Sequence, residues 1–102
     1  MGVDPRGREV AMFAVVGQVS IDAGREDEST DFLKANVVPR VQQAPGLVGG
    51  YWVSVQDGKG LGFLLFETEE AARRAAEMAK DQPRPDYITS ADFNVREVVA
   101  QA

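Results

Sequence analysis

The side chains of this chain that could carry chemistry belong to few residue types, because its 102 residues include no cysteine and no histidine. The absence of cysteine removes disulfides, thiolate nucleophiles and zinc–thiolate sites and agrees with a reducing compartment, so we expect a cytoplasmic protein. The absence of histidine removes the commonest general base and the commonest transition-metal ligand. An acidic cluster at residues 67–70 is explained by the start of a helix, and we expect no metal site.

One group of side chains combines an aromatic ring with hydrogen-bonding groups on strand-like segments. If every strand keeps its polar residues on the same side, these side chains share one face of a sheet. A mostly apolar cavity with a few convergent polar groups is typical of a small-molecule site. The candidate ligand-binding residues are Trp52, Asn94, Arg96, Gln18 and Ser54.

Two simpler interpretations of these residues stay open. Trp52, the single tryptophan, could instead anchor a subunit interface, where large aromatic side chains contribute much of the binding energy. Asn94 and Arg96 could face solvent near the end of a strand. The neighbouring Tyr51 is expected to pack beneath a helix.

Four strand-like and two helical segments must position these residues. Residues 12–21, 47–56, 61–67 and 93–100 are rich in β-branched and aromatic side chains, and "DGKG" at 57–60 predicts a hairpin turn. Helical spacing predicts helices over residues 27–44 and from Thr68 onward, and residues 81–92 are expected to form a loop.

Each helix carries a distinctive signal. Pro39 predicts a kink, or a restart of the first helix with the proline in its first turn, and the Pro45-Gly46 pair should end that helix. Thr68 is a candidate N-cap of the second helix. The second helix places alanines on one face, which predicts close packing against the sheet; they are Ala72, Ala75, Ala76 and Ala79.

The order of elements predicts an α+β protein with the ferredoxin-like βαββαβ fold, a four-stranded antiparallel sheet with both helices on one face. The uncovered face would carry bulky apolar side chains, because residues 61–66 are apolar on both sides of their strand. A solvated face should alternate apolar with polar residues. We therefore expect a second copy of the chain to cover this face.

Composition excludes several classes of protein. With 16 acidic against 11 basic residues the net charge is -5, which disfavours binding to nucleic acid. No apolar run approaches the length of a membrane-spanning helix, so we expect no membrane partner. Residues 1–10 mix glycine, proline and charge and are expected to form a disordered lead-in to a single domain over residues 11–102.

Six segments together resemble a known family of proteins. They are "MFAVVGQVSI", the helix ending in "APG", "GGYW", "DGKG", "FETEEAARRAA" and "NVREVV". The resemblance is to the dimeric α/β-barrel superfamily, in its antibiotic-biosynthesis-monooxygenase-like branch. It implies ferredoxin-like protomers whose sheets face each other around a cavity. It also implies cofactor-independent quinone-forming oxygenases, which hold an aromatic substrate among Trp, Tyr and Asn side chains, or haem degraders, whose iron-ligating histidine this chain lacks.

We therefore expect a homodimer that binds a small aromatic or quinol-type ligand without a cofactor, in the cavity between the paired sheets. In a cofactor-independent monooxygenase of this kind, Trp52 and Asn94 would position the substrate and Arg96 would stabilise its developing negative charge. The alternative is a non-catalytic dimerisation or regulatory module whose barrel interior is filled by Phe63, Phe66 and Trp52. A lyase or isomerase with Glu97 as base rests on fold analogy alone.

Overall fold

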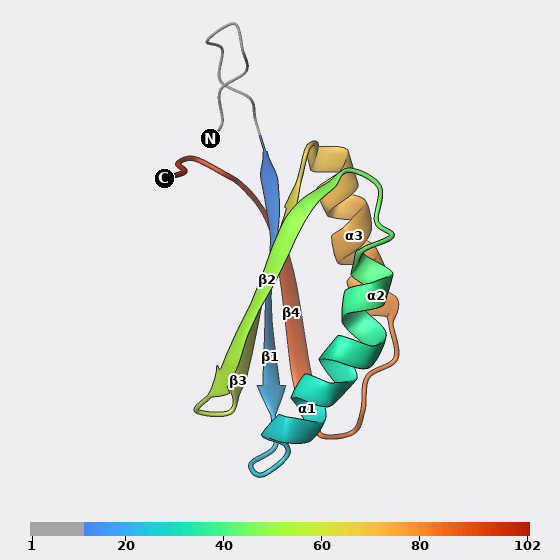
Figure 1. Ribbon diagram of the computed structural model, residues 1–102, viewed down its shortest axis with the longest axis vertical. Coiled ribbons are helices and arrows are strands. Elements are labelled where there is room, and N and C mark those ends of the chain that lie inside the picture. The colour runs from blue at the N-terminus through green and yellow to red at the C-terminus, as the bar shows by residue number, and fades with distance from the viewer. Residues whose placement is uncertain (1–11) are drawn as a thin grey trace, which may run out of the picture.

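The computed structural model describes residues 12–102, which form one antiparallel sheet with helices on one of its faces (Figure 1). The predicted lead-in at residues 1–10 lies outside the described residues. The strands lie in the order β2-β3-β1-β4, so the predicted ferredoxin-like α+β fold is confirmed. The elements are β1 (Phe13–Ile21), α1 (Glu26–Phe32), η1 (Leu33–Val37), α2 (Val38–Val41), β2 (Leu47–Gln56), β3 (Lys59–Phe66), α3 (Glu69–Asp81) and β4 (Ile88–Glu97).

The hairpin between β2 and β3 forms at the predicted "DGKG" segment, and its turn has two residues. Asp57 and Gly58 adopt positive φ angles of 53° and 73°. Such a turn matches the twist of paired strands and favours Asp-Gly. It aligns Gln56 with Lys59, but register shifts near Gly49 and Ser54 change the pairing farther along β2.

The first helix restarts at Pro39, one of the two predicted outcomes, and a π-helical segment that was not predicted precedes the restart. The chain passes from α1 through the π-helical turns of η1 and continues as α2, with Pro39 in the first turn. Proline has no amide hydrogen, so an α-helical ladder loses a bond here, and the π-helical turns of η1 lie directly before this point. The helix ends before Gly46, whose φ is 78°.

Helix α3 is held close to the sheet by its alanines. The Thr68 hydroxyl accepts a hydrogen bond from the Ala71 amide at 3.1 Å, which confirms the predicted N-cap. Ala72 and Ala76 are buried and pack with Val15 and Phe66 in the hydrophobic core. With only a methyl group on this face, the helix backbone can approach the strands. The core therefore lies beneath α3 at one end of the sheet.

Strand β4 begins earlier than predicted. It runs over Ile88–Glu97 rather than residues 93–100, and Ile88 pairs with Ile21. The proline-containing loop is therefore shorter than predicted. Residues 88–92 have a loop-like composition, but they pair with β1, and this pairing within the sheet overrides their local preference. Just before β4, the buried Tyr87 donates its hydroxyl hydrogen to the Glu28 carbonyl at 3.2 Å and lies under the Arg25 guanidinium.

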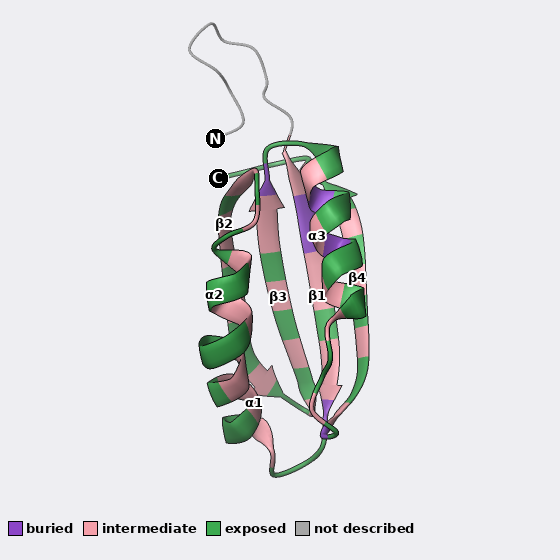
Figure 2. Cartoon of the chain, turned by 90° about the vertical axis from the view of Figure 1, so that its right-hand side faces the viewer, coloured by how far each residue is buried: buried purple, intermediate pink, exposed green. Residues whose placement is uncertain are grey.

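The sheet face opposite the helices is rich in exposed apolar side chains. Tyr51 is 73% exposed and pairs with Phe63, which is 40% exposed; Val53 and Leu61, which pair with each other two residues along the same strands, are also exposed. The expectation that Tyr51 packs beneath a helix is therefore wrong, because its pairing with Phe63 places it on the open face. Figure 2 shows the helices together on the other face, α2 beside β2 and α3 over β1.

Candidate functional site

One row of residues crosses all four strands on the face that the helices cover. Trp52 pairs with Gly62, Gly62 with Gly17, and Gly17 with Phe93. The row therefore has an aromatic ring at each end and two glycines in the middle. Side chains in one cross-strand row stand on the same face of a sheet, so both rings lie beneath the helices.

The two glycines are needed for the position of the two rings. A Cβ atom at Gly62 would lie 2.6 Å from Cδ1 of Trp52, and one at Gly17 would lie 3.0 Å from Cδ1 of Phe93. Both distances are shorter than ordinary van der Waals contact. Each ring thus rests over the backbone of its glycine neighbour, and neither glycine contributes a side chain of its own to the space between the sheet and the helices.

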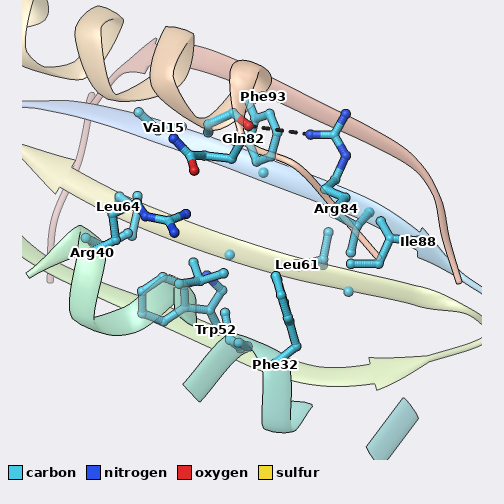
Figure 3. A pocket seen from close by; sticks show the side chains of 18 of the residues that line it. Val15, Phe32, Arg40, Trp52, Leu61, Leu64, Gln82, Arg84, Ile88 and Phe93 are labelled. Carbon is cyan, nitrogen blue, oxygen red and sulfur yellow. Dashed lines mark hydrogen bonds between the residues drawn. The ribbon is translucent and has the colours of Figure 1, made fainter. Parts of the chain in front are cut away.

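A cavity of about 230 Å³ occupies this space (Figure 3). The sheet supplies its floor, while the first helix and the end of α3 supply its walls. No residue of α1, η1 or α2 is buried, although Phe32, Val37 and Val41 line the cavity. A helix that packs directly on a sheet buries an apolar stripe. The first helix instead stands over an incompletely filled space.

Few polar groups reach this mainly apolar cavity. Its polar side chains are Ser29, Thr30, Arg40, Gln82 and Arg84, together with the indole nitrogen of Trp52. Arg84 donates a hydrogen bond to the Ala79 carbonyl at 3.4 Å. Arg40 takes part in no salt bridge among residues 12–102. No aspartate or glutamate lines the cavity, so its formal charge is positive.

The ion pair with perturbed pKa values lies at the start of the first helix and not in the cavity lining. A hydrogen bond between the Arg25 and Glu28 side chains raises the pKa of Arg25 and lowers the pKa of Glu28. Within the cavity, none of the side chains is a carboxylate or imidazole that could act as a general base at neutral pH. A reaction here would need a substrate that gives up its proton readily.

The residues of the cavity do not suit haem. Haem iron is ligated by histidine, cysteine or tyrosine, or by methionine together with histidine. Met78 is the sole lining residue of these types, and the chain has no histidine. The described part of the chain also contains no cluster of three or more acidic, cysteine or histidine side chains that could hold a metal ion.

The predicted site residues divide between the two faces of the sheet. Trp52 lies in the cavity, whereas Asn94, Arg96 and Gln18 occupy rows of the open face; Asn94, for example, pairs with Val16, which pairs with Phe63. The exposed Ser54 lies at a register shift of β2. The prediction that all five side chains share one face is therefore wrong. The alternative in which Phe63, Phe66 and Trp52 together fill a barrel interior is also wrong, because Phe63 lies on the opposite face of the sheet from the other two.

The reason is parity along the strands. The polar residues of β1 and β4 lie on the opposite face of the sheet from Trp52. The pairing through β3 places Tyr51, not Trp52, in the row of Asn94. Sequence reasoning missed Gly17, Gly62, Phe93 and Arg40 as parts of the site. One signal was available: Gly60 and Gly62 alternate along β3, which removes side chains from one face of that strand.

No protein-family model and no curated protein matches this chain, but solved structures do. A protein of unknown function from Nitrosomonas europaea matches with a TM-score of 0.68 and 18% identity, over 91% of this chain and 94% of its own. The haem degrader MhuD from Mycobacterium tuberculosis, solved with two haems in its active site, matches with a TM-score of 0.63 and 22% identity, over 88% and 98%.

A third structure is a monooxygenase, the ActVA-Orf6 product of Streptomyces coelicolor in complex with nanaomycin D. It matches with a TM-score of 0.57 and 18% identity, over 97% of this chain and 92% of its own. The chain has the fold of these proteins. The resemblance to antibiotic-biosynthesis-monooxygenase-like proteins inferred from the sequence is confirmed at the level of fold. No helix of residues 12–102 is long and apolar enough to cross a membrane.

Proposed function

We propose that this protein binds a small aromatic or quinol-type molecule in the cavity between its sheet and its helices and oxidises it as a cofactor-independent, monooxygenase-like enzyme. The observation that carries the proposal is the row Trp52–Gly62–Gly17–Phe93 beneath a helix with no buried residue. A flat ring placed between Trp52 and Phe93 would contact both aromatic side chains. Burial of a ligand there would supply the apolar contacts that the first helix lacks.

The oxidation would rest on the substrate's own chemistry. A quinol or phenol supplies the electrons, one atom of O₂ enters the product and the other leaves as water with the protons that the substrate releases. The residues of the cavity would orient the ring and exclude bulk water. The structural neighbours support this class of function, since one is a monooxygenase solved with a bound ligand and another degrades haem.

We also propose that the open sheet face pairs with a second copy, which would form the expected dimeric barrel. Tyr51, Val53, Leu61 and Phe63 expose apolar surface on this face. A symmetric pair would bury it. Gln18, Ser54, Asn94 and Arg96 stay candidates for contacts to the partner or to a ligand between the sheets. Cytoplasmic localisation stays a prediction.

Binding and turnover can be tested separately. Isothermal titration of a panel of naphthols and quinols should identify a ligand of the wild-type protein, and Trp52→Ala should weaken its binding at least about tenfold through loss of one aromatic wall. Tyr51→Ala, the neighbouring position on the other face, is the matched control and should bind normally. Oxygen consumption with the tightest-binding quinol then tests catalysis.

The alternative function is a non-catalytic dimerisation or regulatory module, which the exposed apolar open face favours. A stable dimer in which no aromatic compound binds, or in which Trp52→Ala binds as wild type does, would overturn the cavity proposal and leave this alternative. Ligand binding without oxygen consumption would retain the cavity as a binding site and remove the oxygenase assignment.

A further inference from the structure

We infer that the ligand of the cavity is an aromatic anion and that Arg40 binds its negative charge. The inference rests on the proposed binding function and adds the charge class of the ligand. Its basis is the distribution of charge: the whole chain has 16 acidic and 11 basic residues, yet the charged side chains that line the cavity are Arg40 and Arg84. A cavity of this composition disfavours a cation and favours a carboxylate, phenolate or enolate.

Arg40 is better placed than Arg84 to bind the anion. The guanidinium of Arg84 already donates to the Ala79 carbonyl near the end of α3. Arg40 makes no side-chain hydrogen bond or salt bridge among residues 12–102. It extends into the cavity from α2, and Gln82 lies on the opposite wall near the end of α3 (Figure 3). A planar guanidinium binds carboxylate and related oxyanions through paired hydrogen bonds.

The aromatic part of the ligand and its charge would thus be bound by different parts of the cavity. The flat apolar part of the ligand would fit between the rings of Trp52 and Phe93, on the sheet that forms the floor of the cavity. Arg40 lies in the helical wall above the sheet. The absence of a general base from the lining agrees with a ligand that enters already ionised. Preferential binding of the anion would also favour ionisation of a bound phenol.

A matched pair of naphthoquinones tests the inference. Menadione is neutral, and lawsone carries in place of the methyl group a hydroxyl that is ionised at neutral pH; both are suitable because the chain has no thiol to react with them. Quenching of the single tryptophan, Trp52, corrected for absorption by the quinone, reports binding inside the cavity. We expect lawsone to bind wild-type protein about tenfold more tightly than menadione, as for a charge-assisted hydrogen bond.

Three variants separate charge from packing. Arg40→Gln should weaken lawsone binding about tenfold and leave menadione binding within about twofold, and Arg40→Lys should retain part of the preference. Arg73→Gln, on the exposed side of α3 where Arg73 pairs with Glu69, is the control and should change neither. Because Arg40 is exposed and not buried in the core, thermal unfolding of Arg40→Gln should match the wild type.

Equal binding of both quinones to wild-type protein would overturn the anion preference and leave the cavity as an aromatic site. Equal weakening of both ligands by Arg40→Gln would show that Arg40 supports packing, which also overturns the inference. If neither quinone, nor any compound of the naphthol and quinol panel, binds the wild-type protein, the proposed function fails and this inference fails with it.

Discussion

Trp52 and Gly62 are cross-strand partners, and a Cβ atom at Gly62 would lie 2.6 Å from Cδ1 and 2.9 Å from Nε1 of the indole. The ring can occupy its place over the sheet only because position 62 has no side chain. The same relation holds on the other side of the row between Phe93 and Gly17. The aromatic walls of the cavity therefore depend on glycines in neighbouring strands.

Gly62→Ala should displace the Trp52 ring while the sheet still forms. The added methyl group overlaps the indole, so we expect a loss of about 1–3 kcal/mol in the free energy of unfolding and a shift in tryptophan emission. The urea denaturation curve and the emission spectrum measure these effects. Gly49→Ala is the matched control, because its Cβ would meet no atom within 4 Å. Identical spectra for the two variants would contradict the role of Gly62.

Phe63→Asp should weaken self-association if the open face is the dimer interface. Phe63 is 40% exposed and pairs with Tyr51 in the centre of the apolar open face. A carboxylate from each copy would then be buried without a partner, which is strongly unfavourable. Sedimentation velocity should show a shift to monomers. Ala35→Asp, on the exposed side of η1, introduces the same charge and should leave the association state unchanged. A dimer that survives Phe63→Asp would show that the open face is not the dimer interface.

Ala76→Leu should destabilise the fold through overpacking. Ala76 is 3% exposed and lies in the core with Val15 and Phe66, where α3 approaches the sheet. Additional methyl groups force the helix outward, and we expect a loss of about 1–3 kcal/mol in unfolding free energy by urea denaturation. Glu77→Leu, at the next and exposed position, should change stability by less than about 0.5 kcal/mol. A fully stable Ala76→Leu would show that the helix can move away without loss.

The Arg25–Glu28 pair predicts a small dependence of stability on pH. The hydrogen bond from Arg25 lowers the pKa of Glu28 in the folded protein, so the pair stabilises the fold above the ordinary carboxyl pKa, and this contribution is lost as the pH falls through the folded value. Glu28→Gln should therefore lower Tm slightly at neutral pH, and the difference from wild type should shrink in acid.

The control for this experiment is Asp31→Asn on the same helix, whose carboxylate makes none of the salt bridges of residues 12–102. Asp31→Asn should lower Tm at neutral pH by less than Glu28→Gln does, because it breaks no ion pair among these residues. A Glu28→Gln difference that stays constant from neutral to acid pH would mean that the ion pair does not contribute, as is common for exposed pairs.

Much of this protein could be predicted from local sequence signals. The Asp57-Gly58 turn, the Thr68 cap, the stop at Gly46 and the alanine face of α3 depend on interactions within a few residues, and each is present in the structure. The order of the elements then leaves few topologies, because crossovers are right-handed and hairpin strands are neighbours. The ferredoxin-like fold and its apolar open face follow from these facts.

Which face carries Trp52 was decided only by the tertiary structure. Side chains alternate along a strand, so a shift of one residue in the pairing moves an entire set to the other face. The register shifts of β2 and its pairing through β3 with β1 and β4 together place Trp52 over Gly62 and send Asn94 and Arg96 to the opposite side. Such pairing joins residues far apart in the chain, and neither composition nor periodicity within one strand determines it. The sequence by itself therefore determined the elements and their order, whereas the contacts between strands determined the cavity.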